Sequence, residues 1–139
     1  MPYKYSDSLY STAISLARLI SNLAEEEFEH TGLTPSYAIL LMVVSDNPGI
    51  QPGHLSKEMN LTPSTITRLI EKLEYKGLLE RRVSGKYTSV YPTKMNNQLE
   101  FKIRTAWARL QKRYSILLGE ELNKEMSNLT YKVINKLKK

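Results

Sequence analysis

Hydrophobic positions recur at helical spacing along most of the chain, which predicts a mainly helical protein. Between residues 7 and 30 an apolar side chain returns every three or four residues, so one face of a long helix is apolar. The same spacing covers residues 99–117 and, after Gly119, residues 122–137. We therefore expect three long helices, each with one apolar face that must be covered.

Signals for helix starts place further boundaries. Thr34 is a candidate cap, and Pro35 fits the first turn of a helix that continues to Asp46. The apolar middle of this helix is continuous, which predicts burial on most sides. Nearer the other end of the chain, Thr93 is a candidate cap for the long helix that follows Pro92.

The middle of the chain predicts two helices in close succession. Pro52 begins a short helix that breaks at Asn60. Thr62 then caps a longer helix, which has Pro63 in its first turn and ends at Gly77. Two helices joined by so short a turn are typical of a helix-turn-helix.

Two short β-type runs, residues 79–83 and 88–91, follow the second of these helices. A polar turn around Ser84, Gly85 and Lys86 joins them, which predicts a β-hairpin. A hairpin directly after a helix-turn-helix is a candidate wing. The predicted fold class is therefore mainly α with a small β-hairpin wing, that is, a winged helix-turn-helix flanked by long dimerisation helices.

The longer helix of the pair has two unlike faces. At about 100° per residue, Leu69, Ile70 and Leu73 fall within about 60° of Ile66, so this side must face a core. The opposite side carries short hydroxyls near its amino end and a long guanidinium on Arg68. Small polar groups allow close approach to base edges, and an arginine can donate two hydrogen bonds to guanine O6 and N7.

We predict that this helix face and the basic hairpin bind DNA together. A solvated helix face is the alternative for any such helix taken alone, but the neighbouring hairpin favours the DNA-binding interpretation. The predicted DNA-binding residues are Thr62, Ser64, Thr65, Thr67, Arg68 and Lys72 from the helix, and Arg81, Arg82 and Lys86 from the hairpin.

The charge distribution supports an anionic partner. The chain has 20 Lys and Arg against 14 Asp and Glu, a formal net charge of +6. Residues 1–51 carry a net charge of −4, residues 52–94 carry +4 and residues 95–139 carry +6. Basicity therefore begins where the predicted helix-turn-helix begins, and the acidic run at residues 25–29 is expected to be a solvated face that avoids DNA.

Several classes of function lack support in the sequence. The chain has no cysteine, and His30 and His54 belong to no spaced set of metal ligands, so we expect surface or capping roles for them and no cofactor. No catalytic constellation is apparent, which argues against an enzyme. The longest apolar run, residues 37–44, is far shorter than the roughly 20 residues of a membrane span, and no signal peptide is apparent. We expect no membrane partner and a cytoplasmic location.

Two segments of the chain resemble the MarR family of transcription regulators. "LTPSYAILLMVV" resembles the second helix of that family, and "HLSKEMNLTPSTITRLIEKLEYKGLLERR" resembles its helix-turn-helix and the entry to its wing. The resemblance implies a homodimer that binds a palindromic double-stranded DNA operator and releases it when a small phenolic or other effector ligand binds. It also implies that Ser64, Thr65, Thr67 and Arg68 meet the major groove, with Arg82 near the base of the wing.

The turn of the hairpin departs from the pattern of this family. The usual wing has a longer turn with an Asp-x-Arg pair, whereas "RRVSGKYTSVYPT" is shorter and lacks that pair. Lys86 is the only basic residue left at the tip of the wing. We expect Lys86 to contact phosphate.

The chain is expected to form a single domain, residues 1–139, with two functional parts. Residues 34–94 form the winged helix-turn-helix core, and residues 1–33 and 95–139 form a helical dimerisation region, because so small a core leaves the long apolar stripes uncovered. The longer helix of the helix-turn-helix, which begins after Thr62, is called the reading helix below. A two-fold dimer would present two reading helices roughly 34 Å apart. The alternatives are a compact monomer and, for function, a winged-helix adaptor that binds an acidic protein instead of DNA.

Overall fold

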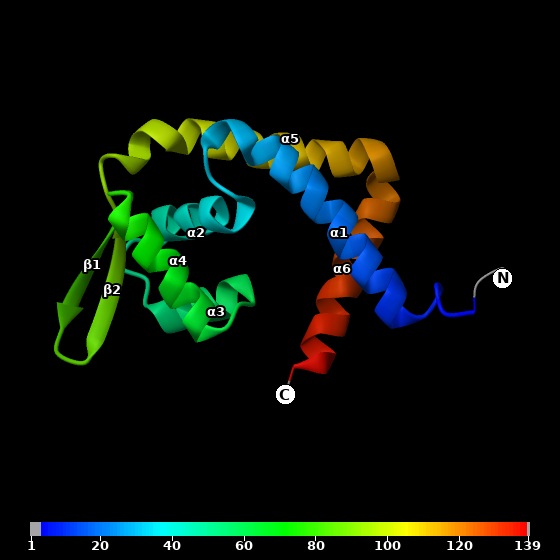
Figure 1. The fold of residues 1–139 in the computed structure, drawn as a ribbon, viewed down its shortest axis with the longest axis horizontal. Coiled ribbons are helices and arrows are strands. Elements are labelled where there is room, and N and C mark those ends of the chain that lie inside the picture. Colours follow the sequence, from blue (N-terminus) through cyan, green and yellow to red (C-terminus); the bar gives the residue numbers. More distant parts are fainter. Residues whose placement is uncertain (1–3, 139) are drawn as a thin grey trace.

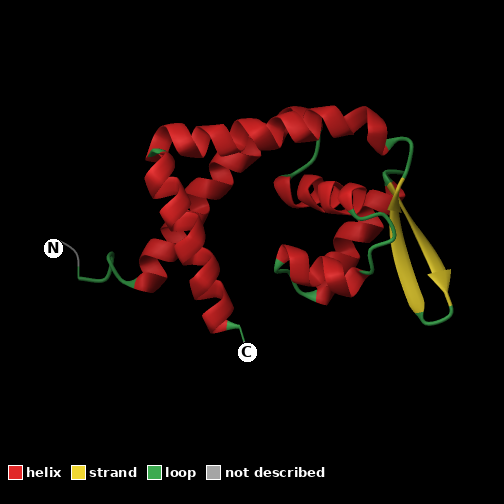
Figure 2. Ribbon diagram, turned by 180° about the vertical axis from the view of Figure 1, so that it is seen from behind, coloured by secondary structure: helices red, strands yellow, loops and turns green. Residues whose placement is uncertain are grey.

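The computed structural model describes residues 4–138, and a long helix, α5, connects its two parts (Figure 1). Over these residues the elements are α1 (Leu9–Phe28), η1 (Glu29–Thr31), α2 (Pro35–Asp46), α3 (Pro52–Met59), α4 (Pro63–Tyr75), β1 (Leu79–Ser84), β2 (Tyr87–Pro92), α5 (Asn96–Leu118) and α6 (Glu120–Leu137). The second to fourth α-helices and the hairpin lie beside the amino-terminal half of α5, and α1 and α6 extend from its other half (Figure 2). The predicted class, mainly α with a small hairpin, is confirmed.

Most predicted helix boundaries are confirmed, and their local causes are visible. Thr62 Oγ1 accepts a hydrogen bond from the amide of Thr65, so Thr62 is a true side-chain cap of α4. Asn60 adopts the left-handed conformation at φ 55°, which breaks the chain between α3 and α4. Thr34 occupies the cap position of α2, but its side chain accepts no hydrogen bond from that helix.

The prediction that Thr93 caps the next long helix is wrong. Helix α5 begins at Asn96, and the cap position belongs to Met95, whose side chain makes no capping bond. The hydroxyl of Thr93 donates instead to the carbonyl of Gly77, and its amide donates to the carbonyl of Leu78 at 3.2 Å. Thr93 therefore ties the exit of the hairpin to the segment that follows α4.

The hairpin is antiparallel, and each strand extends one residue further towards the tip than predicted. Its register pairs Arg82 with Ser89, and a two-residue turn at Gly85 and Lys86 closes it. Ile50, in the loop after α2, adds a bridge to Val90 at the base of the hairpin: the Val90 amide donates to the Ile50 carbonyl at 2.9 Å. The base of the wing is thus fixed to the helical core while its tip projects outward (Figure 1).

The core lies among α2, α4 and the first half of α5. Ile66, Ile70 and Leu73 are at most 2% exposed, which confirms the predicted inner face of α4. They pack with buried residues of the other elements, among them Leu40, Leu41, Val44, Leu55, Val90, Ile103, Ala106 and Leu110. Each fully buried Leu or Ile contributes about 1.5 to 3 kcal/mol, so this cluster is enough to hold α4 against its neighbours.

The predicted solvated acidic run is only partly solvated. Arg113 of α5 lies between two of its carboxylates, with Nη1 3.0 Å from Glu26 and 3.2 Å from Glu27. Glu25 and Glu29 are exposed, as expected. The run therefore also serves to join α1 to α5.

The far half of the molecule carries uncovered apolar side chains. None of the 18 residues of α6 is buried, although its stripe includes Leu129 and Leu137, which are 54% and 71% exposed. Leu9 at the start of α1 and Leu117 near the end of α5 are also exposed. Within residues 4–138 no helix combines the length and apolarity that crossing a membrane would require.

Candidate nucleic-acid interface

Helix α4 presents its predicted polar side chains to solvent. Ser64, Thr67, Arg68 and Lys72 are exposed, and Thr65 is partly buried. Because the opposite side of the helix is buried in the core, this face can turn only outward. The structure therefore places these five predicted residues on one accessible surface, and the sixth, Thr62, is exposed at the cap position of the helix.

The hydroxyl groups at the start of α4 form a small network. Thr62 Oγ1 lies 2.9 Å from Thr65 Oγ1 and 3.3 Å from Ser64 Oγ. Arg68 Nη2 donates to Thr65 Oγ1 at 3.4 Å, and Thr67 Oγ1 donates to the carbonyl of Pro63 at 3.0 Å. These long or local contacts leave most of the Arg68 guanidinium free to donate to another acceptor.

The two hairpin arginines lie on opposite faces of the hairpin, because they are adjacent in one strand. Arg81 faces α4, where its Nε and Nη2 donate to Glu74 Oε1 at 3.1 and 2.8 Å. These hydrogen bonds raise the pKa of Arg81 above its ordinary value. Arg81 thereby connects the wing to the reading helix.

Arg82 lies on the other face and has a different environment. Its Nε and Nη2 donate to Glu80 Oε1 at 3.2 and 2.6 Å, and its guanidinium carbon lies 3.9 Å from the centre of the Tyr91 ring. The hydrogen bonds to Glu80 raise the pKa of Arg82. Lys86, at the tip, is exposed and carries the remaining predicted hairpin charge.

Reasoning from sequence missed Glu74, Glu80 and Tyr91 as partners of the two arginines. The Tyr91 contact follows from the strand register, which pairs Glu80 with Tyr91 and so brings Tyr91 diagonally opposite Arg82. Alternation along β1 was the available signal for the separation of Arg81 from Arg82. The Glu74 contact depends on how α4 packs against the hairpin, which a local pattern does not contain.

A hollow of about 360 Å³ lies where α1, α2 and α5 meet. Its apolar lining includes Ile20, Ile39, Trp107, Leu110 and Tyr114. Trp107 is 39% exposed there.

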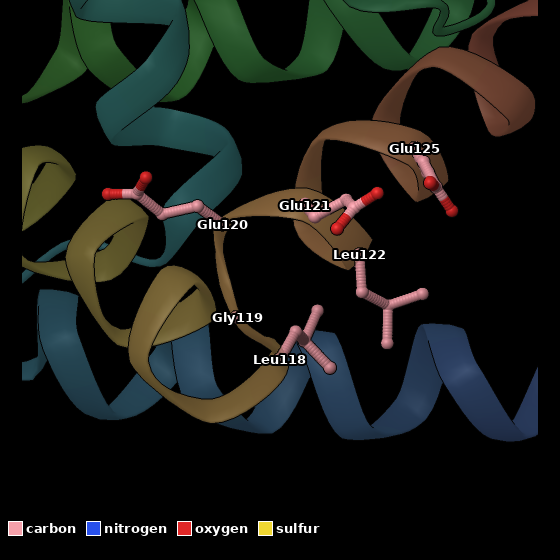
Figure 3. A pocket seen from close by; sticks show the side chains of 6 residues that line it. All are labelled: Leu118, Gly119, Glu120, Glu121, Leu122 and Glu125. Atoms are coloured by element: carbon pink, nitrogen blue, oxygen red, sulfur yellow. The ribbon is translucent and has the colours of Figure 1, made fainter.

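Another hollow lies at the bend between α5 and α6 and has a contrasting character. Glu120, Glu121 and Glu125 surround it together with Leu118 and Leu122 (Figure 3). Three carboxylates repel phosphate, so this hollow itself does not suit a nucleic-acid backbone. The predicted DNA-binding residues all lie in the other half, which holds α4 and the hairpin.

A short helix, an exposed reading helix and a basic hairpin in this arrangement define a winged helix-turn-helix protein. Residues 31–86 match the sequence model of the MarR family, the part of the chain that holds all the predicted DNA-binding residues. Over these residues the chain is similar to the MarR family.

Comparisons over nearly the whole chain, of sequence and of fold, also find transcription regulators. The chain is 24% identical to the HTH-type transcriptional repressor MdtR of Bacillus subtilis over 137 residues, covering 94% of this chain and 88% of that protein. Its fold is similar to that of MepR from S. aureus, solved as a DNA complex, with a TM-score of 0.80, 17% identity and coverage of 97% and 100% of the two chains. It is also similar to PcaV from Streptomyces coelicolor, solved with its natural ligand, with a TM-score of 0.81, 16% identity and 98% coverage of both.

Proposed function

We propose that the protein is a homodimeric transcription regulator of the repressor type that binds a palindromic DNA operator. The observation that carries this proposal is the outward face of α4, with its hydroxyls and Arg68, next to a hairpin that carries Arg81, Arg82 and Lys86. An α-helix of this kind fits the major groove, and a basic wing can contact the backbone beside it. The DNA complex of the structurally similar MepR supports this proposal. Such a regulator would act in the cytoplasm.

The dimer is proposed from the uncovered apolar face of the flanking helices. Residues 1–33 and 95–139 would form the dimerisation region, because α6 buries nothing within one chain. An isologous contact would cover the stripe of each protomer and fix the distance between the two reading helices. Two linked reading helices also bind more tightly than one, through their effective concentration.

Substitution of Arg68 tests the reading face directly. Duplexes are first selected from a random library with the purified protein, which should yield a palindrome if the protein is a two-fold dimer. Arg68→Ala should then weaken binding by about 1 to 3 kcal/mol per base contact and widen the tolerance at one position of each half-site. Arg109→Ala, which removes an exposed arginine of α5, serves as the matched control and should leave the selected sequence unchanged.

Two results would contradict this assignment. Unchanged affinity and base preference in Arg68→Ala would remove Arg68 from the readout. Failure of the wild-type protein to bind any duplex, even at low salt, would contradict DNA binding itself and favour the adaptor alternative.

The hollow among α1, α2 and α5 is the proposed effector site. It lies between the dimerisation helices and the winged helix-turn-helix, residues 34–94, which is called the reading head below. A ligand that prefers one arrangement of these two parts would change the distance between the two reading helices of a dimer. Its apolar lining suits a small phenolic ligand, and the Tyr114 hydroxyl, which donates to the Ile20 carbonyl at 3.3 Å, can still accept a hydrogen bond from it.

Trp107 is the only tryptophan of the chain, so its fluorescence reports on this hollow. Addition of a phenolic probe such as 4-hydroxybenzoate should change that fluorescence saturably and release the operator over the same concentration range. A fluorescence change without release would contradict an effector role for this hollow.

A further inference from the structure

The Arg82 guanidinium is held from two directions in the free protein. Glu80 Oε1 accepts from both Nε and Nη2 along one edge of the group. The Tyr91 ring covers one flat side, with the guanidinium carbon 3.9 Å from the ring centre. The side chain nevertheless remains 62% exposed, so the restraint does not hide it from a ligand.

The contacts with Glu80 leave one end of the guanidinium for another acceptor. A guanidinium has five N–H groups, and the Glu80 carboxylate takes one from Nε and one from Nη2. Both N–H groups of Nη1 and the second one of Nη2 point away from that edge. This remaining pair of nitrogens has the spacing that binds a phosphate with two parallel hydrogen bonds.

Tyr91 is itself fixed to the helical core. A Cβ atom at Gly49 would lie 3.2 Å from the Tyr91 hydroxyl oxygen, so this ring packs directly against the loop after α2. The neighbouring residue Val90 pairs with Ile50 of the same loop, and the Gly49 amide donates to the Val90 carbonyl at 2.8 Å. The ring is therefore a rigid support.

We propose that Tyr91, together with Glu80, is a positioning residue that holds Arg82 as a preformed donor for a DNA phosphate at the base of the wing. This inference rests on the proposed DNA binding. It assigns a function to two side chains outside the predicted binding set, in a chain whose wing lacks the Asp-x-Arg pair. Preorganisation strengthens binding because less rotamer freedom of the arginine is lost on contact.

The test compares Tyr91→Leu with Tyr91→Phe, each in the wild-type and the Arg82→Ala background. Tyr91→Leu should weaken binding to all duplexes by about two- to five-fold per subunit, the scale of one cation–π contact, whereas Tyr91→Phe keeps the ring, loses only the hydroxyl and should weaken binding clearly less. In the Arg82→Ala background the effect of Tyr91→Leu should vanish. Arg82→Ala should itself lower the salt slope by about 1 per subunit.

Tyr87→Leu is the matched control, because Tyr87 is an exposed tyrosine on the same strand and face. Its effect on affinity, of whatever size, should be equal in both backgrounds. A Tyr91→Leu effect that persists in Arg82→Ala, or an Arg82→Ala protein with unchanged affinity and salt slope, would overturn the proposal.

A measurement without DNA separates this inference from the proposed function. The Nε–H proton of Arg82, assigned in ¹H–¹⁵N spectra with the Arg82→Lys protein, should show a ring-current shift that Tyr91→Phe keeps and Tyr91→Leu loses. Absence of that shift in the wild type would refute the held guanidinium. If the shift is present but the wild type binds no duplex, DNA binding and the phosphate assignment fail together. Binding by the wild type with no loss in Arg82→Ala removes the phosphate role of Arg82 alone.

Discussion

At the scale of single residues, chemically identical side chains have different functions according to the bonds that they make. Thr34 and Thr62 both precede a proline that begins a helix, and both have extended backbone angles. Only Thr62 accepts a helix amide with its hydroxyl. A cap position and a capping bond are therefore separate properties, and only the bond contributes directly to helix stability.

This difference predicts unequal costs for the same substitution. Thr62→Ala should lower the free energy of unfolding by about 1 kcal/mol, because an amide in the first turn of α4 loses its acceptor. Thr34→Ala should cost clearly less, since no side-chain bond is lost. Urea denaturation at one fixed protein concentration measures both; equal losses would show that the Thr62 bond contributes nothing.

At the scale of elements, α5 contacts the reading head through two neighbouring residues of opposite character. Ile103 is 1% exposed within the core, whereas the Arg104 side chain is 40% exposed and forms an ion pair with Asp46 of α2 at 2.6 Å. The hydrogen bonds that Arg104 donates to Asp46 raise the pKa of Arg104. Burial should nevertheless dominate the attachment of α5, because water screens the ion pair.

Two substitutions in α5 test whether burial of Ile103 contributes more to stability than the ion pair of Arg104. Ile103→Ala should lower the free energy of unfolding by about 2 to 5 kcal/mol, through lost burial and the cavity that remains. Arg104→Gln should lower it by less than about 1 kcal/mol, and added salt should diminish even that difference. A larger loss from Arg104→Gln than from Ile103→Ala in the same urea titration would reverse this order.

The sequence was sufficient for the elements and for the faces of α4, but not for contacts between elements. Ile66, Ile70 and Leu73 were predictable because helical periodicity alone separates inside from outside. The hydroxyl of Thr93 bonds to Gly77, 16 positions earlier, and Arg113 meets Glu27 across 86 positions. Such partners depend on how whole elements pack, so no local pattern contains them.

At the scale of the whole molecule, the predicted DNA-binding residues and the exposed apolar stripe of α6 lie in different halves. The predicted DNA-binding residues lie in the half that holds α4 and the hairpin, whereas the exposed leucines of α6 and the glutamates around Gly119 lie in the other (Figure 3). One end is thus suited to an anionic partner and the other to a second copy of the chain. We expect loss of the dimer to reduce operator affinity without altering the fold of the reading head.

Leu129→Glu tests whether dimer formation can be lost while the reading head keeps its fold. A carboxylate in the stripe of α6 should oppose self-association, because it would have to be buried without a partner. Sedimentation velocity should show monomers, and operator affinity should fall, while nonspecific binding per chain remains. Asn128→Glu adds the same charge at the adjacent exposed position and should remain dimeric. A monomeric wild type, or a fully dimeric Leu129→Glu, would contradict the proposed interface.

Because α6 has no buried side chain within one chain, a dimer that covers it would depend on the number of chains in the cell. Where chains are scarce relative to the dissociation constant of the dimer, halving their number lowers the dimer population about fourfold. Synthesis and turnover of the chain would then set promoter occupancy more steeply than in proportion to its abundance.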